Sequence, residues 1–278
     1  MRHPILASII IAAHQAREFI HEAIASALMQ GVPMEIIVAP DEPHDYADLA
    51  ALDPRIRVLE PVARPTGAGP ARNRALAVAR GRFIALLDAD DLWSPDYLAR
   101  LVPLAEAAGV AFGRTAIATW EGRVIREVRP ASGRADYATF STAFASFHGV
   151  VRRDPGERCG ARHWQDVPAE DVLFDLESLA LAGGSAPYDD TAIYHLRQRP
   201  GSVTQGDAFI GDIATAYDRL ISLVESGGTL VPPDQRADVA AVFRAWARMN
   251  ARFEAARQKP GRGNSSLTYQ QFVKTFLA

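Results

Sequence analysis

The chain has 278 residues, of which 48% are hydrophobic and 23% charged, and its net charge is −3. This composition is ordinary for a globular protein with ample apolar material for a core, and it gives no global sign of nucleic-acid binding. Cys159 is the one cysteine, which excludes an internal disulfide and a thiolate metal cluster and fits a reducing compartment.

No apolar run approaches the roughly 18 residues that a membrane span requires. The first segment, MRHPILASIIIAA, has the charge and apolar stretch of a short signal peptide. The same residues also make a good buried first strand that leads into a patterned helix. We therefore expect a cytoplasmic protein.

Strands and helices alternate through the first 87 residues. Apolar runs at 7–13, 35–39, 55–59 and 82–87 predict strands, and the first of them is apolar enough to be covered on both faces. Apolar residues at helical spacing predict one helix at 19–28 and a second that begins at Gly69–Pro70. This alternation predicts a mainly parallel sheet with helices on both faces.

The pattern becomes less regular after residue 109. Two strands, 110–120 and 123–128, are predicted on either side of a turn, and another is predicted at 147–153. A helix from Glu170 and a strand at 191–197 follow. From residue 207 the pattern is helical only, so we predict a domain of residues 1–206 and a C-terminal helical extension of residues 207–278.

Three carboxylates, Asp88, Asp90 and Asp91, follow directly after the predicted strand at 82–87. Because isolated charges are costly to bury, such a cluster lies at a surface end, caps a helix or holds a cation. Ligands of open parallel sheets bind beyond the carboxyl ends of the strands, where this cluster would lie. Asp91 fits a turn or a helix cap. Taken alone, the motif supports solvated capping and a functional site about equally.

Four ordered segments between residues 5 and about 205 resemble the family 2 glycosyltransferases. They are SIIIAAHQAREFIHEAIASALMQGVPMEIIV, GPARNRALAVARGRFIALLDADDLWSPDYL, AEDVLFDLESLALAG and YHLRQRPGSVT. The second contains the family's Asp-X-Asp motif, and the third contains its Glu-Asp motif. The resemblance implies an α/β fold of GT-A type, which is Rossmann-like.

The resemblance also implies a metal-dependent, inverting transfer of a sugar from a nucleoside diphosphate sugar, with UDP as the expected nucleotide. The acceptor would be a saccharide or glycolipid in cell-surface polysaccharide synthesis. Mn²⁺ or Mg²⁺ would neutralise the departing diphosphate, and such ions take one or two protein carboxylates plus phosphate oxygens. Asp90 is then the expected metal ligand. Asp88 would contact the ribose, or the metal through water, while Asp41 and Arg72 would hold the nucleoside.

Inversion requires a base on the acceptor side, opposite the departing diphosphate. The family's Glu-Asp motif matches Glu170–Asp171, so the resemblance implies that Asp171 is the catalytic base. Acidic residues are favourable at any helix N-terminus, so the pair carries this meaning only together with the surrounding matches.

Several other polar residues are open to two interpretations. Arg197, with its neighbours on the last strand, forms either a phosphate-facing basic rim that binds the donor or a solvated strand edge. His148 lies where an acceptor could reach, although a lone histidine is more often structural, and Asn73 is expected to hydrogen-bond within its own helix. His14–Gln15 and residues 40–43 depart from the family's usual Tyr-Asn and Asp-Asp-Gly-Ser.

The C-terminal extension is basic. Residues 227–278 hold eight Lys or Arg against three Asp or Glu, and Arg244, Arg248 and Arg252 share one helix face. A solvated basic face is the simpler interpretation. The alternative is a dock for anionic lipid headgroups or a lipid-pyrophosphate acceptor, with peripheral contact at the inner face of a membrane.

Two other functions are alternatives to sugar transfer. A nucleotidyltransferase also sets Asp-bound metal at the ends of a parallel sheet, but it would favour a Gly-rich, Lys-containing triphosphate loop, which AAHQAR is not. A non-catalytic subunit that binds nucleotide sugars or assists assembly is the alternative from a different class.

Overall fold

The computed structural model describes residues 4–130, 132–153, 163–199, 207–258 and 267–278. The strands are β1 (Ala7–Ala13), β2 (Met34–Pro40), β3 (Ile56–Val58), β4 (Phe83–Leu86), β5 (Leu92–Trp93), β6 (Val110–Thr119), β7 (Val124–Val128), β8 (Arg134–Asp136), β9 (Val150–Arg152) and β10 (Ser185–Gln198). The helices are α1 (Ile20–Leu28), α2 (Ala68–Val78), α3 (Tyr97–Ala108), α4 (Tyr137–Ala143), α5 (Glu170–Leu181), α6 (Asp207–Ser226), α7 (Arg236–Gln258) and α8 (Tyr269–Leu277).

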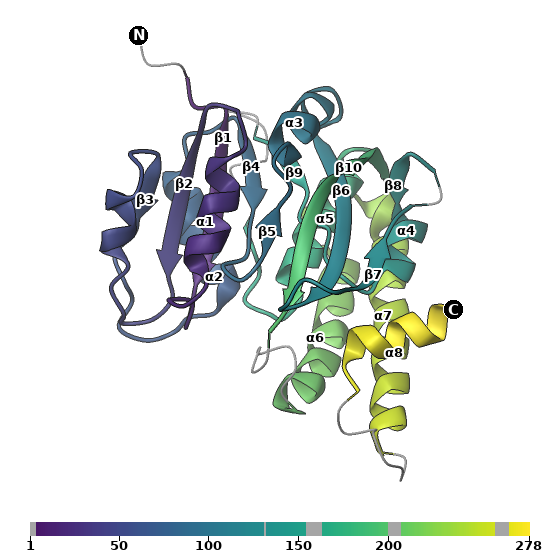
Figure 1. The fold of residues 1–278 in the computed structure, drawn as a ribbon. Helices are drawn as coiled ribbons and strands as arrows, with labels where there is room; N and C mark the ends of the chain where they lie inside the picture. The colour runs from purple at the N-terminus through teal and green to yellow at the C-terminus, as the bar shows by residue number, and fades with distance from the viewer. Residues whose placement is uncertain (1–3, 131, 154–162, 200–206, 259–266) are drawn as a thin grey trace.

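One large sheet organises the chain, with strand order β3-β2-β1-β4-β9-β6-β10-β5 (Figure 1). The first four strands are parallel, and so are β6 and β10. The other neighbours are antiparallel, among them the predicted hairpin of β6 and β7, whose turn contains Gly122 at a φ of 86°. The α/β fold class is therefore confirmed, with a sheet that is mixed in its second half.

Helices cover both faces of this sheet. Ile9 and Ile11 of β1 lie in one apolar cluster with α1 and α3, whereas Ile10 lies in a second cluster with α2 and α5. Successive side chains of a strand point to opposite faces, so a strand with two covered faces has an unbroken apolar sequence. The prediction for residues 7–13 is confirmed on this point.

The C-terminal helices pack against the sheet domain and do not form a core of their own. Tyr217 of α6 and Phe243 and Trp246 of α7 belong to the same apolar cluster as Ile10 of β1. In Figure 1, α6, α7 and α8 gather at the lower side of the view, next to α4 and α5. The boundary at residue 206 stays a prediction, but the segments on its two sides share one core.

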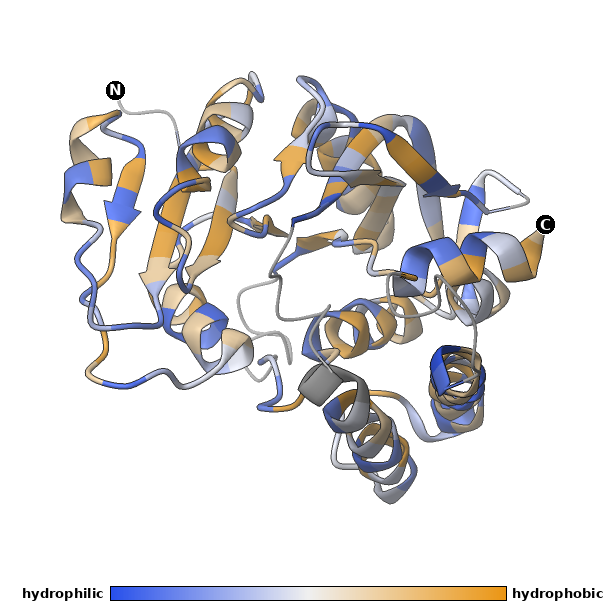
Figure 2. Cartoon of the chain, turned by 60° about the horizontal axis from the view of Figure 1, so that its bottom comes forward, coloured by the Kyte–Doolittle hydropathy of each residue, from blue (hydrophilic) through white to orange (hydrophobic). Residues whose placement is uncertain are grey.

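Hydropathy follows the same layout. Figure 2 shows the strands of the N-terminal half as mainly hydrophobic, whereas the helices carry both hydrophobic and hydrophilic residues. Such amphipathic helices bury their apolar face and expose their polar face to solvent. Within the described ranges, every helix is too short or too polar to cross a bilayer.

The start of α2 lies unusually close to the segment that leads into α5. A Cβ atom added at Gly69 would lie 2.3 Å from the carbonyl oxygen of Gln165. Four residues on, the Asn73 side chain donates to the carbonyl of Trp164 and accepts from its N–H, both at 2.8 Å. The expectation that Asn73 bonds within its own helix is wrong. Its amide joins α2 to residues 163–169.

We predict that Gly69→Ala lowers the free energy of unfolding by about 1–3 kcal/mol, because the new methyl group would overlap a backbone carbonyl that cannot rotate away. Urea unfolding followed by circular dichroism measures this change. Gly211→Ala is the control, because its Cβ would meet no atom within 4 Å and alanine favours the helix. Equal stability of Gly69→Ala and wild type would contradict the close contact.

Candidate active site

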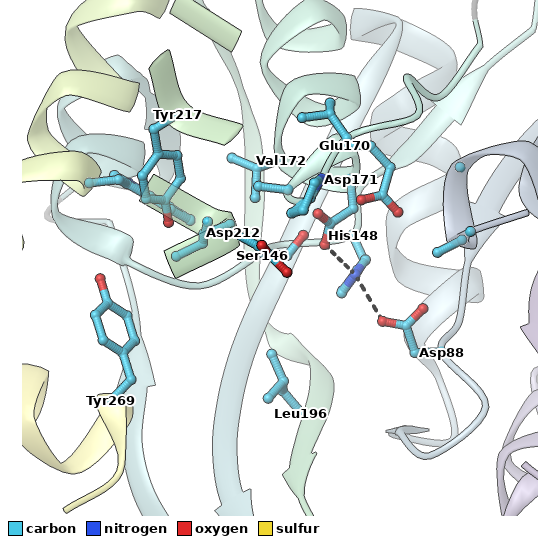
Figure 3. Close-up of a pocket in the computed structure, with 18 of the residues that line it drawn as sticks. Asp88, Ser146, His148, Glu170, Asp171, Val172, Leu196, Asp212, Tyr217 and Tyr269 are labelled. Carbon is cyan, nitrogen blue, oxygen red and sulfur yellow. Dashed lines mark ion pairs between the residues drawn. The ribbon is translucent and has the colours of Figure 1, made fainter. Parts of the chain in front are cut away.

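A cavity of about 610 Å³ lies where β4 ends and α2 and α5 begin. Five of the six predicted site residues line it, namely Arg72, Asp88, Asp90, Asp171 and Arg197. Figure 3 shows its interior, with Asp88, His148 and Asp171 on one side and Tyr217 and Tyr269 on the other. The carboxyl ends of the strands thus open into the cavity, as the acidic motif predicted.

The acidic turn, residues 88–91, is joined to β10 by hydrogen bonds. The backbone N–H of Asp88 donates to the Tyr194 hydroxyl at 3.0 Å, and Asp91 Oδ1 accepts from the backbone N–H of Arg197 at 2.7 Å. Asp91 is buried, and its backbone N–H donates to the Asp88 carbonyl at 3.1 Å, which gives it the turn role expected for it. Asp88 and Asp90 are partly exposed, with side-chain exposures of 30% and 26%. They are the carboxylates of the motif that a ligand can reach.

Arg72 joins the two acidic motifs. It is almost fully buried, and its guanidinium donates to Asp88 Oδ1 at 2.6 Å and to Glu170 Oε1. Burial raises the pKa of Glu170 to about 7, although Arg72 acts in the opposite direction. The Arg72 Nε atom is buried and has no hydrogen-bond partner among the described residues. The arginine predicted to hold the nucleoside therefore also holds two carboxylates in place.

His148 stands between the two predicted functional carboxylates. Its Nε2 lies 3.3 Å from Asp171 Oδ2 and 3.6 Å from Asp88 Oδ2, and both ion pairs are drawn in Figure 3. The imidazole is 2% exposed and stacks on the Tyr194 ring, with centroids 4.3 Å apart. The sequence offered a structural histidine as the commoner interpretation. The structure instead brings His148 into contact with both predicted functional carboxylates.

Buried groups fix the backbone at His148. Asp175, one turn after Asp171 on α5, accepts from the N–H groups of His148 and Gly149 at 2.9 and 3.0 Å. The Tyr97 hydroxyl donates to the His148 carbonyl at 3.0 Å. His148 itself has a φ of 50°, which is uncommon for a residue with a side chain and is held here by these three bonds. No sequence motif marks Asp175 or Tyr97 as positioning residues.

The charges of His148 and Asp171 stabilise each other. Burial alone would lower the pKa of His148, but Asp171, Asp88 and Asp175 raise it to about 9. Burial works against the charged form of Asp171 too, yet His148 and Arg72 hold its pKa well below the usual range. Asp171 is therefore a carboxylate at neutral pH.

Asp90 is a partly exposed carboxylate whose charged form a bound cation would stabilise. Burial and the nearby Asp88 raise the pKa of Asp90, while Arg199 Nε donates to its Oδ2 at 3.0 Å. The described residues contain no group of three or more protein side chains suited to a metal. Mg²⁺ and Mn²⁺ bound with phosphates need only one or two carboxylates, so this donor set fits an ion that binds together with a diphosphate.

Arg197 is held by contacts within the protein and does not lie on a solvent-exposed basic rim. Its Nε donates to the Asp90 carbonyl at 2.6 Å, another nitrogen pairs with Glu22 of α1, and its guanidinium lies 3.9 Å from the Trp120 ring centroid. The side chain is buried, so the solvated-edge interpretation of this residue is wrong. Its Nη2 lacks a partner within the described part of the chain. Donor binding by Arg197 stays a prediction.

Asp41 lies outside the set of residues that line the cavity. Its carboxylate accepts hydrogen bonds from Thr66 N, Thr66 Oγ1 and Gly67 N at 2.6–3.1 Å. These bonds shape the loop that enters α2, and Gly67 itself lines the cavity. The geometry gives Asp41 a positioning role, and its contact with a nucleoside stays a prediction.

Known proteins match this chain in sequence over part of its length. The family model described as Glycosyl transferase family 2 matches residues 8–158. The succinoglycan biosynthesis protein ExoO of Rhizobium meliloti is 41% identical over 123 residues, which are 42% of this chain and 35% of that protein. The Escherichia coli UDP-Glc:alpha-D-GlcNAc-diphosphoundecaprenol beta-1,3-glucosyltransferase WfgD is 35% identical over 111 residues, which are 38% of this chain and 44% of that protein. The matches thus span less than half of these relatives.

Solved structures share the fold at low identity. Staphylococcus aureus TarS 1–349, in complex with UDP-GlcNAc, superposes with a TM-score of 0.64 and 16% identity over 96% of this chain and 78% of that chain. The mannosyltransferase PcManGT from Pyrobaculum calidifontis, in complex with GDP-Man and Mn²⁺, gives a TM-score of 0.60 and 19% identity over 95% and 78%.

An α/β fold of GT-A type, with an acidic cavity at the ends of its strands, defines the class of this protein. The family match covers more than half of the chain. The chain belongs to glycosyl transferase family 2.

The ion pairs of His148 predict a dependence of stability on pH. A histidine whose pKa is raised from about 6.5 to about 9 on folding stabilises the protein fully below pH 6.5 and loses that contribution as pH rises through 9. We expect the free energy of unfolding to fall by up to about 3 kcal/mol between pH 7 and 9.5. Urea unfolding at a series of pH values measures it.

His148→Gln is the comparison variant, because glutamine does not titrate. Its stability should change less than that of wild type between pH 7 and 9.5. Glu170 does not affect this comparison. Because its pKa is raised to about 7, the pH dependence of stability that it causes lies below about pH 7. Parallel pH curves for the two proteins would show that His148 is not charged in the folded state.

Proposed function

We propose that this protein is a metal-dependent, inverting glycosyltransferase. It would transfer a sugar from a nucleoside diphosphate sugar, with UDP as the nucleotide, to a saccharide or lipid-linked acceptor in cell-surface polysaccharide synthesis. The observation that carries the proposal is the position of His148, whose Nε2 lies within 3.6 Å of both Asp88 and Asp171. The predicted donor-side and acceptor-side carboxylates thus face one cavity.

On the donor side, Arg72 and Asp88 would hold the nucleoside part of the donor. Asp90 would hold Mn²⁺ or Mg²⁺, and the ion would supply positive charge to neutralise the departing diphosphate. PcManGT is described in complex with GDP-Man and Mn²⁺, which supports a divalent ion here. Support for UDP comes from TarS, described in complex with UDP-GlcNAc, and from WfgD, named for UDP-Glc.

On the acceptor side, Asp171 would take the proton of the acceptor hydroxyl as its oxygen attacks the anomeric carbon. General-base assistance of this kind is worth about 10² to 10⁴ in rate. His148 would hold the Asp171 carboxylate in position and in its charged form until the acceptor arrives. Asp171 also lies in the first turn of α5, where the helix dipole favours a negative charge.

The acceptor of WfgD is named as a diphosphoundecaprenol-linked sugar, which supports a lipid-linked acceptor and work at the inner face of a membrane. The basic face of α7 gives this contact limited support. Arg244 pairs with Glu225 of α6, and the Arg252 guanidinium lies 4.8 Å from the Phe276 ring centroid. Two of the three arginines therefore also join helices, and membrane contact stays a prediction.

We predict that Asp171→Asn lowers the rate of sugar transfer about 10²- to 10⁴-fold, because asparagine keeps the shape of the side chain and cannot accept the proton. Donor affinity should stay near that of wild type. Release of nucleoside diphosphate from a panel of nucleotide sugars, with acceptor present, measures the rate. Asp218→Asn, on the exposed side of α6, is the matched control. Near-normal transfer by Asp171→Asn would exclude Asp171 as the base and make Glu170 the next candidate.

The metal proposal predicts a separate result. Asp90→Ala should remove the Mn²⁺-dependent thermal stabilisation by a nucleoside diphosphate, because the ion loses its protein ligand while the fold is kept. Asp96→Ala is the control, because Asp96 is 69% exposed and lies outside the cavity. Unchanged Mn²⁺-dependent stabilisation of folded Asp90→Ala would refute the assignment. If wild type binds a nucleotide sugar but transfers no sugar, the non-catalytic subunit becomes the better description.

A further inference from the structure

The cavity continues past Asp171 into a part formed by the C-terminal helices. The residues of this part, here called the C-terminal wall, are Asp212, Ile213 and Tyr217 of α6, Trp246, Asn250 and Phe253 of α7, and Tyr269 and Gln270 of α8. None of them belongs to the segments that resemble the family or to the matched residues 8–158. The wall lines the same cavity as the predicted base, Asp171.

The wall is aromatic and carries polar groups that face inward. Tyr217 and Trp246 pack edge to face, with centroids 6.3 Å apart and planes at 85°. Figure 3 shows the Tyr217 and Tyr269 hydroxyl groups directed toward each other, on the side of the cavity away from Asp88. The Tyr269 hydroxyl oxygen is buried and has no hydrogen-bond partner among the described residues. A buried hydroxyl without a partner is costly unless a ligand supplies one.

The aromatic side chains of the wall are held in fixed positions. The Trp246 Nε1 donates to the Phe140 carbonyl at 2.8 Å. Gln270 accepts from the buried Arg126 Nε at 2.7 Å and donates to the Phe144 carbonyl at 3.0 Å, which ties α8 to the rest of the chain beside Tyr269. A rigid aromatic surface with few polar groups is typical of a small-molecule site.

The two parts of the cavity differ in charge. The described lining residues that are basic are Arg72, His148 and Arg197. Arg72 and Arg197 lie on the donor side, whereas the His148 Nε2 lies between Asp88 and Asp171. A uronic acid or a phosphate on the acceptor side would meet the carboxylates of Asp171 and Asp212, and the lining cation beside Asp171, His148, is already paired with two carboxylates. Aromatic faces with amide and hydroxyl groups suit the apolar face and the hydroxyl groups of a neutral sugar.

We infer that the C-terminal wall is the acceptor subsite and that it binds a neutral sugar residue, with Tyr269 and Tyr217 as hydrogen-bonding partners. This inference rests on the proposed function and deepens it. The charged diphosphate of a lipid-linked acceptor would then lie outside the wall, and the first sugar of that acceptor would lie inside it.

The test uses p-nitrophenyl glycosides in pairs that differ only in a C6 carboxylate, such as the glucoside and the glucuronide. Further neutral probes are the galactoside, the mannoside and the N-acetylglucosaminide. Binding to the full chain is measured by saturation-transfer NMR titration, which needs no catalysis. At least one neutral glycoside should bind, and its uronide partner should bind at least about tenfold more weakly. Equal or tighter binding of the uronides would overturn the inference, and so would an absence of binding by every neutral probe.

Variants then locate the binding. Tyr269→Phe removes the hydroxyl and keeps the ring, and should weaken binding of the neutral glycoside about three- to tenfold. Tyr137→Phe is the matched control, because the Tyr137 hydroxyl bonds Gln235 outside the cavity. An unchanged dissociation constant for both Tyr269→Phe and Tyr217→Phe would overturn the assignment of the wall.

A second readout separates this inference from the proposed function. With a nucleotide sugar as donor, Tyr269→Phe should raise the acceptor KM by the same factor and leave the donor KM unchanged. If wild type neither binds nor turns over any nucleotide sugar, the proposed function fails, while the glycoside titrations still decide whether the wall binds neutral sugars.

Discussion

The site depends on the balance of charge around Arg72 and His148. Six carboxylates, from Asp88 to Asp171, line one cavity, and without buried cations their repulsion would prevent several of them from ionising. Arg72 pairs with Asp88 and Glu170, and His148 pairs with Asp88 and Asp171. The carboxylates at the end of β4 are therefore joined to those at the start of α5 by two cations. The pairs with Glu170 and Asp171 also hold the start of α5 against the end of β4.

The groups around these ion pairs are themselves held by hydrogen bonds and ring contacts. The backbone at His148 is fixed by Asp175 and Tyr97, its ring is fixed by Tyr194, and Tyr194 in turn accepts the N–H of Asp88. A buried charge is tolerated only when its partners stay in place, so these contacts are a condition for the ion pairs. The reacting groups are thus prearranged by hydrogen bonds that a donor or acceptor would not have to form.

Much of this could be predicted from local patterns in the sequence. The strands 7–13 and 82–87 and the helix at Glu170 were identified because an apolar run or a helical period marks a buried element directly. α3 is not among the predicted elements, although Leu98, Leu101 and Ala105 have helical spacing. The roles of Asp175 and Asn73 depend on contacts across 27 and 91 residues, which no local pattern records.

The packing of α8 has a consequence for the order of folding. Tyr269 and Gln270 come late in the chain, while the carboxylates that they face across the cavity begin at Asp88. Contacts over such a long stretch of sequence form slowly, because closing a long loop costs entropy before the contact is gained. During synthesis the donor half could fold on the ribosome with the cavity still open on one side. The part of the cavity that α8 lines would then be among the last features to appear.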